Sequence, residues 1–229
     1  NPAVVVPHGG PTGQAMDDFS QWATALASRG YVVIQPNFRG STGYGLAFQK
    51  ANYKDLGGGD LKDVIAAKDF LVASGYVDRN KVGIAGGSYG GFMTLMAIGK
   101  SPDTFAAAVN LFGIIDWAEM WKHEDALLQA YQRSLIGSPD DSPDVYKAAS
   151  PMTYIQAAKV PLLVLQGDND IRVPAGQSRL VIDTLKAKGN IVEGHFYPAE
   201  GHGFYKRENN EDSLRRMIAW FDKYLKGAK

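Results

Sequence analysis

One serine lies among closely spaced glycines, in the segment 86–91, which reads GGSYGG. This segment fits the pattern GxSxG, which is typical of a nucleophilic serine on a sharp turn between a strand and a helix. Such a turn leaves no room for a side chain at Gly86 or Gly90, because either would collide with the neighbouring backbone. Ser88 is therefore a candidate nucleophile, although a glycine-rich turn with an incidental serine carries the same letters.

A serine hydroxyl reacts well only when a base accepts its proton, and histidine is the usual base. His202 lies between two glycines, directly after an expected strand, where a loop lets the imidazole project over a sheet edge. His195 lies inside that strand pattern and His123 lies in a helical segment, so both are poorer candidates. We predict His202 as the base, against the alternative of a solvated surface histidine.

The base needs an acid to orient it, and two carboxylates follow another expected strand. Asp168 and Asp170 lie between that strand and a helix. The order serine, aspartate, histidine along the chain is the one expected of an α/β-hydrolase. Spacing alone does not choose between the two aspartates, and a loop aspartate often only forms a turn.

An acyl-transfer site also needs two N–H donors for the oxyanion of its tetrahedral intermediate. The backbone N–H of Tyr89, directly after the serine, is one. The loop 7–11 reads PHGGP, an HGG type of motif that brings bare backbone close to a substrate, and it should supply the other. We expect His8 to be a structural hydrogen-bonding residue of this loop and not a second base.

The elements that must position these residues follow from hydrophobic periodicity. Six short apolar runs predict strands: Ala3–Val6, Tyr31–Gln35, Lys81–Ala85, Ala106–Leu111, Pro161–Gln166 and Ile191–Tyr197. Five segments with apolar residues three and four apart predict helices: Asp17–Arg29, Asp60–Ser74, Tyr89–Lys100, Ala175–Lys188 and Asn209–Leu225. Because strands and helices alternate, we predict an α/β-hydrolase fold, with a mostly parallel sheet covered by helices on both faces.

One segment interrupts this alternation. Residues 116–136 form a helical stretch rich in large apolar side chains, followed by a Ser-, Pro- and Asp-rich segment at 137–144. We expect it to be an excursion near the strand ends, where an active site could use it. At the other end of the sequence, Ala3–Val6 reads as a buried central strand, so the chain is expected to begin inside a larger protein.

Composition excludes several functional classes. The 229 residues are 45% hydrophobic, which suits one globular domain over 1–229, and Lys plus Arg (24) balance Asp plus Glu (24). Without an excess of charge, nucleic acid and anionic membranes are not expected partners. No apolar run is long enough to cross a bilayer, and our working expectation is a cytoplasmic location.

No cofactor or metal is expected either. There is no cysteine, and the histidines lack ligand spacing such as HExxH. Residues 57–60 read GGGD before a helix, but they lack the lysine of a phosphate loop, so they are expected to shape a helix start.

Five ordered motifs together resemble the catalytic domain of the prolyl oligopeptidase family, most closely its acylaminoacyl peptidase branch. They are HGGP at 8–11, PNFRGSTGYG at 36–45, GGSYGG at 86–91, DNDIRVP at 168–174 and EGHG at 200–203. The resemblance implies that Asp170 is the acid of the triad, because the family's aspartate stands two residues before an arginine. It also implies that this arginine, Arg172, holds a substrate backbone carbonyl through its fork of donors.

By the same resemblance, Gly10 gives the second oxyanion N–H. The side chain before the scissile bond would enter an apolar, roomy pocket lined by Ile114, Ile115, Trp117, Leu128 and Tyr131. Residues 36–45 would brace the site. The family also carries an N-terminal β-propeller; none is present here, and the first strands of the hydrolase sheet are expected to be missing as well.

The implied activity is that of a serine peptidase acting on short or N-acylated peptides through an acyl-enzyme. A carboxylesterase with the same triad is the alternative, so the expected partner is a peptide or a small ester. A non-catalytic binding module of this fold is disfavoured, since it would have no need of all three triad residues. A homo-oligomer and a propeller in the parent protein are left open.

Overall fold

The central feature of the fold is one sheet of parallel strands. The computed structural model describes residues 1–227, and within this range the strands are β1 (Ala3–Val5), β2 (Val32–Ile34), β3 (Val82–Gly87), β4 (Ala107–Leu111), β5 (Leu162–Gly167) and β6 (Val192–Tyr197). They lie in the order β2-β1-β3-β4-β5-β6, and every neighbouring pair is parallel. The predicted α/β sheet is confirmed, and its strands fall within the predicted runs to within one or two residues.

Both faces of the sheet are buried, because successive residues of a strand point to opposite faces. In β1, Ala3 and Val5 belong to one apolar cluster, whereas Val4 belongs to another, together with Val6 directly after the strand. In β5, Leu162 and Leu163 divide in the same way. A strand buried on both faces reads as an unbroken apolar run, which is why these segments could be found in the sequence.

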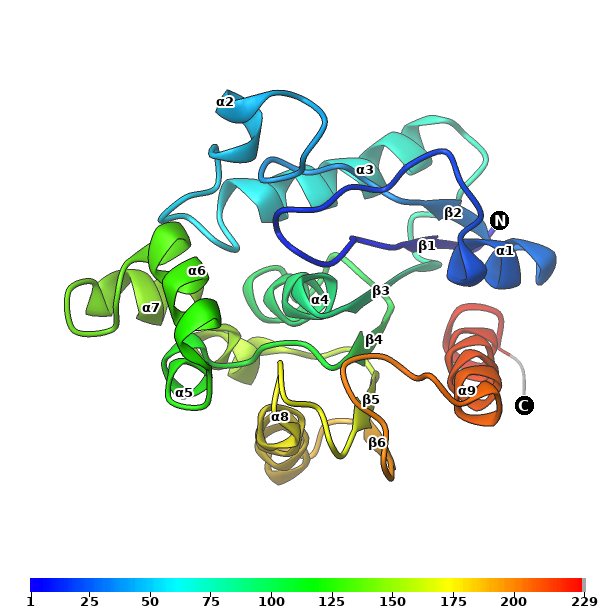
Figure 1. Ribbon diagram of the computed structural model, residues 1–229. Coiled ribbons are helices and arrows are strands. Elements are labelled where there is room, and N and C mark those ends of the chain that lie inside the picture. Colours follow the sequence, from blue (N-terminus) through cyan, green and yellow to red (C-terminus); the bar gives the residue numbers. More distant parts are fainter. Residues whose placement is uncertain (228–229) are drawn as a thin grey trace.

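Helices cover the two faces in separate layers (Figure 1). One layer contains α3 (Gly59–Ala73), α4 (Tyr89–Lys100) and α8 (Ala175–Ala187), and the other contains α1 (Gln21–Ser28) and α9 (Arg207–Leu225). The five predicted helices are present; α4 has the predicted bounds and the other four have shifted ends. For example, α1 begins four residues later than expected, because the Ser20 side chain caps it by accepting a hydrogen bond from the Ala23 N–H.

The excursion after β4 is more broken than predicted. It holds two helices, α5 (Trp117–Trp121) and α6 (Ala126–Ile136), because Asp125 caps a new helix start by accepting from the N–H groups of Leu127 and Leu128. A third helix, α7 (Pro143–Ala149), was not predicted and begins at the end of the Ser-, Pro- and Asp-rich segment 137–144. A short helix α2 (Leu46–Gln49) and two 3₁₀ turns, Pro151–Thr153 and Ile155–Ala157, were also not predicted.

The loops at the carboxyl edge of the sheet carry the candidate functional residues. Gly10 follows β1, Ser88 follows β3, Asp170 follows β5 and His202 follows β6. The carboxyl ends of parallel strands lie on the same edge, and the reversal of strand order at β1 opens a crevice there. The sheet therefore brings together residues from distant parts of the sequence.

Candidate active site

Ser88 occupies a strained turn between β3 and α4. Its backbone has φ 57° and ψ −119°, a conformation that non-glycine residues rarely adopt. A Cβ at Gly86 would collide with the Gly90 backbone, and one at Gly90 would collide with the carbonyl oxygen of Pro7. The close approach that the glycine spacing predicts is therefore present, and the serine side chain is held above the first turn of α4.

His202 and Asp170 form a hydrogen-bonded pair. His202 Nδ1 lies 2.8 Å from Asp170 Oδ2; the aspartate side chain is fully buried and the imidazole is 20% exposed. An ionised carboxylate can only accept, so Nδ1 carries the proton and Nε2 is left as an acceptor. This is the tautomer that a histidine needs in order to take a proton from a hydroxyl.

The structure also distinguishes Asp168 from Asp170, which their spacing in the sequence could not do. Asp168 points away from the histidine and forms an ion pair with Arg179, at 2.9 Å between Oδ1 and Nη2. Asp170 instead turns inward, where its Oδ1 accepts from the backbone N–H groups of Arg172 and Val173, each at 2.9 Å. These bonds fix the carboxylate so that Oδ2 faces the imidazole.

Three residues that the sequence analysis did not select support this pair. Gln166 of β5 donates to Asp170 Oδ2 at 3.3 Å, and the Phe112 ring packs against His202 at 4.8 Å between ring centroids. Glu200 is buried and accepts from the N–H groups of Tyr205 and Lys206, which closes the histidine loop. The position of Glu200 two residues before His202 was visible in the sequence, but its inward orientation was not.

The loop after β1 presents Gly10 to the site. Gly10 has φ 139°, and a Cβ there would lie 2.6 Å from the backbone nitrogen of Thr12, so only glycine fits. His8 stacks on Phe38 with ring centroids 4.3 Å apart, and its Nδ1 donates to the Gly9 carbonyl at 2.7 Å. Burial lowers the pKa of His8, although the hydrogen bond to Gly9 opposes the shift, and its contacts with Phe38 and Gly9 support the loop.

Within residues 1–227, neither the Gly10 nor the Tyr89 backbone N–H donates to an acceptor of the protein. The N–H groups in the first turn of a helix have no partner within that helix, and Tyr89 is the first residue of α4. The partial positive charge of a helix start adds to this donor. The arrangement suits the binding of a negatively charged oxygen.

The segment 36–45 braces the Gly10 loop from outside. Asn37 exchanges two hydrogen bonds with the backbone of Ala15, accepting at 2.7 Å and donating at 2.9 Å. Arg39 forms a two-pronged ion pair with Asp63 of α3, with both N···O distances at 2.7 Å. The bracing role expected of this segment therefore has a physical basis in hydrogen bonds to α3 and to the Gly10 loop.

A buried polar network lies beneath the serine turn. The Tyr89 hydroxyl donates a short hydrogen bond to Asp60 at the start of α3, and the Asn52 amide approaches both groups at 3.4 Å. Burial raises the pKa of Asp60 to about 6, although the hydrogen bonds from Tyr89 and Asn52 oppose the shift. The residue that offers its N–H beside Ser88 is thus anchored through its side chain to a buried acid.

This raised pKa predicts a pH-dependent stability. The folded pKa lies above the unfolded one, so the contribution is fully present below pH 4 and is lost as pH rises through about 6. Relative to Asp60→Asn, the wild type should lose up to about 3 kcal/mol of unfolding free energy between pH 4 and 7. Urea unfolding of both proteins across this range measures the difference, and a constant difference would contradict the raised pKa.

A cavity of about 270 Å³ opens beside Ser88. Its wall includes Gly10, Arg172 and His202, together with four residues expected in the pocket: Ile114, Trp117, Leu128 and Tyr131. The prediction for Ile115 is wrong: it lies in the core with no exposed surface, because consecutive residues turn to opposite sides, and its N–H donates to the Gln177 side chain. Met120, Glu124, Gln132 and Val173 also line the cavity and were not predicted.

A second cavity, of about 320 Å³, shares Ser88 and His202 with the first. Its wall includes Trp22, Gln35 and Phe112. The serine and the histidine thus lie where two cavities meet, so a chain bound across the site could extend into both.

His123 and His195 lie outside both cavities. His195 packs against Tyr197 in β6, with ring centroids 4.5 Å apart, and His123 is exposed beside Glu119, with Nε2 and Oε1 3.1 Å apart. The preference for His202 as the residue that meets Asp170 agrees with this geometry.

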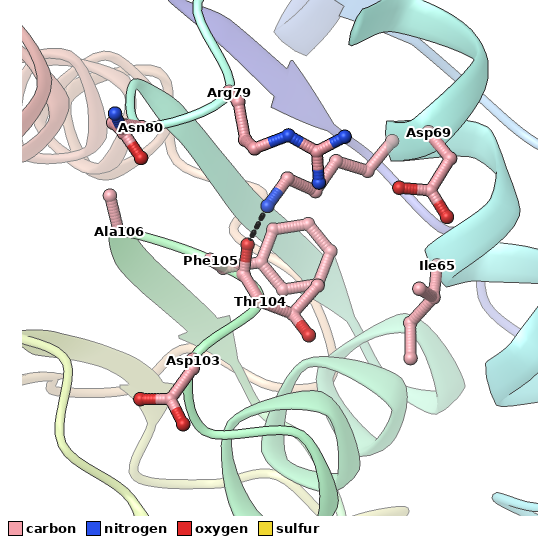
Figure 2. A pocket seen from close by; sticks show the side chains of 9 residues that line it. Ile65, Asp69, Arg79, Asn80, Asp103, Thr104, Phe105 and Ala106 are labelled. Atoms are coloured by element: carbon pink, nitrogen blue, oxygen red, sulfur yellow. Dashed lines mark hydrogen bonds between the residues drawn. The ribbon is translucent and has the colours of Figure 1, made fainter.

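Another cavity, of about 360 Å³, lies at the opposite edge of the sheet, where β3 and β4 begin. Figure 2 shows Arg79, Asp69 and Asp103 around it. Lys68 lines the same cavity and donates a hydrogen bond to the carbonyl of Thr104. Lys68 also approaches the Phe105 ring, at 5.6 Å from its centroid. None of the candidate catalytic residues lies here, and these contacts join α3 to the loop before β4.

Residues 1–227 contain neither a cluster of metal-ligating side chains nor a membrane-spanning helix. No group of three or more His, Cys, Asp or Glu side chains is placed to hold a metal ion. No helix in the same range has the length and apolar character needed to cross a membrane.

GGGD at 57–60 forms the start of α3, where Asp55 accepts from the Gly59 N–H at 2.8 Å.

Comparison with known proteins places this geometry in a family. The sequence profile described as "Prolyl oligopeptidase family" matches residues 17–228. The chain is 34% identical over 92% of its length to dipeptidyl aminopeptidase BIII of Pseudoxanthomonas mexicana, and 31% identical over 99% to the acylamino-acid-releasing enzyme of Arabidopsis thaliana. It spans only 31% and 30% of those two relatives.

One solved structure is similar to this chain over nearly its whole length. The puromycin-hydrolyzing peptidase of Mycobacterium tuberculosis superposes with a TM-score of 0.93 at 35% identity, over 98% of this chain and 34% of the other. At this identity the likeness covers both the fold and the family.

Proposed function

The chain belongs to the prolyl oligopeptidase family of serine hydrolases, and on that basis we propose that it forms the catalytic site of a serine peptidase that cleaves short or N-acylated peptides. The observation that carries the proposal is the buried Asp170–His202 pair, which lies beside the same cavities as the strained Ser88. The chain spans about a third of its curated relatives, so the activity of the whole protein is part of the proposal.

In the proposed mechanism, Ser88 Oγ attacks the carbonyl carbon of the scissile bond while His202 Nε2 takes its proton. Asp170 holds the Nδ1–H tautomer and stabilises the imidazolium that forms. The intermediate then collapses to an acyl-enzyme as His202 gives the proton to the leaving amine. Water, activated by the same histidine, releases the acid and restores the serine.

Two backbone N–H groups, of Gly10 and Tyr89, would stabilise the oxyanion during both steps. Removing one such donor in comparable sites costs about 10²- to 10³-fold in kcat. Arg172 lines the same cavity as the serine, which suits the hydrogen bond to a substrate carbonyl that the family resemblance assigns to it. The apolar wall formed by Ile114, Trp117 and Leu128 would receive the side chain before the scissile bond.

The same machinery can hydrolyse esters, which need less assistance for their leaving group. The discriminating measurement compares kcat/KM of the full-length protein on an N-acetyl-dipeptide anilide and on the matched p-nitrophenyl ester. We expect both to be hydrolysed. Undetectable anilide cleavage, with the ester still hydrolysed, would contradict the peptidase assignment and leave a carboxylesterase.

A further inference from the structure

The cavity beside Ser88 contains an acid that its apolar wall does not explain. Glu124, between α5 and α6, lines this cavity together with Trp117 and Gln132. Both α5 and α6 belong to the excursion after β4, so this acid is independent of the elements that carry the triad.

Polar atoms of these three residues are buried and lack partners. Oε2 of Glu124, Oε1 of Gln132 and Nε1 of Trp117 have no hydrogen-bond partner among the residues that the structure describes. The Gln132 amide nitrogen is already used, donating to the Trp117 carbonyl at 3.1 Å and to the Tyr146 hydroxyl at 3.0 Å. Two acceptors are thus left in one cavity, and buried acceptors without donors are unfavourable.

The electrostatics of Glu124 point the same way. Burial, reinforced by the like charge of the adjacent Asp125, raises its pKa to about 7. Tyr131 of α6 and, at the Ser88 end, Arg172 and His202 line the same cavity, and Tyr146 of α7 feels the charge of Glu124. Lys122 lies in the same excursion but pairs with Glu119 at 2.7 Å.

Building on the proposed peptidase function, we propose that Glu124, with Gln132, binds a positively charged nitrogen of the substrate inside the cavity next to Ser88. An ammonium group has three N–H donors, enough to bond to both acceptors, and its positive charge neutralises the carboxylate. The nitrogen can come from a lysine side chain before the scissile bond or from the free amino terminus of a short peptide. The Trp117 and Leu128 side chains would pack along the methylene chain of a lysine.

The experiment uses three anilides with the full-length protein. Acetyl-Ala-Lys-anilide carries a side-chain ammonium, acetyl-Ala-norleucine-anilide replaces the lysine by an uncharged side chain, and Ala-norleucine-anilide carries only a free amino terminus. The wild type is compared with Glu124→Gln, which keeps the size but removes the charge. Glu119→Gln is the matched control, because Glu119 is a neighbouring exposed acid outside the cavity.

We expect one of the two charged substrates to exceed acetyl-Ala-norleucine-anilide in kcat/KM by about 10- to 100-fold at pH 8. Which of them does so identifies the source of the nitrogen. Glu124→Gln should abolish that preference, measured as the ratio of kcat/KM for the charged substrate to kcat/KM for acetyl-Ala-norleucine-anilide, and Glu119→Gln should keep it. The preference for the lysine substrate, if that is the source, should also rise with pH through about 7, as Glu124 ionises.

Different results would contradict the role of Glu124 and the proposed peptidase function. If the wild type cleaves acetyl-Ala-norleucine-anilide but shows no preference for either charged substrate, or if Glu124→Gln keeps the preference, the role of Glu124 is refuted and the peptidase assignment stands. If no anilide is cleaved and a fluorophosphonate probe fails to label the folded protein, the hydrolase mechanism itself is refuted.

Discussion

Replacing Ser88 with alanine is expected to lower kcat for an acyl-peptide anilide by about 10⁵- to 10⁶-fold and to abolish labelling by a fluorophosphonate probe. The loss is large because the acyl-enzyme cannot form without the hydroxyl, whereas the Asp170–His202 pair and both N–H donors stay in place. Substrate binding should change little, since the Ser88 hydroxyl is only one atom of a cavity of about 270 Å³.

The labelling experiment needs proof that the variant is folded. Thermal unfolding monitored by circular dichroism supplies it, because the turn at φ 57° and ψ −119° strains alanine and serine alike. If the probe labels Ser88→Ala to the same extent as the wild type, another nucleophile reacts with it. That result would remove the basis for the proposed mechanism.

Replacing Asp170 with asparagine is expected to lower kcat by about 10⁴-fold without unfolding the protein. Oδ1 of Asp170 accepts two backbone N–H bonds, so the asparagine oxygen would take that place. Its NH₂ group would then face His202 Nδ1 and donate to it, which moves the histidine proton to Nε2. A histidine protonated at Nε2 cannot accept the proton of Ser88.

Asp168→Asn is the matched control for this variant. It removes a carboxylate two residues away and breaks only a partly exposed ion pair with Arg179. Exposed ion pairs of this kind contribute little free energy, so kcat of Asp168→Asn should stay within about twofold of the wild-type value. Equal losses in the two variants would contradict the assignment of Asp170 as the acid.

The sequence predicted the sheet well because burial on both faces leaves a local signature. The run Ala3–Val6 is apolar without interruption, and its first three residues form β1, which lies between β2 and β3 in the sheet. The turn at Ser88 was predictable for a related reason, since steric exclusion at Gly86 comes from the backbone of Gly90, four residues along the chain, although the exclusion at Gly90 comes from the distant Pro7. The excursion was less predictable, because α5 ends at Trp121 and Asp125 caps the start of α6 by a side-chain contact that periodicity does not register.

The choice between Asp168 and Asp170 shows where local reasoning stops. Both residues follow β5 in the same polar loop, and they differ only in the direction that the loop gives each side chain. Family resemblance pointed to Asp170, and its contacts with His202 and the backbone of Val173 agree with that choice. Glu124 could not have been selected from the sequence, because its burial depends on α5 and α6 packing over the cavity.

The convergence of Gly10, Ser88, Asp170 and His202 at one sheet edge has a practical consequence. The four residues come from four separate loops, and they meet only when β1, β3, β5 and β6 have all joined the sheet. A molecule that has lost any of these strands keeps its serine but not its reactivity. Stoichiometric titration with a covalent phosphonylating reagent would therefore count native molecules directly, and in a partly denatured sample its endpoint would report the folded fraction.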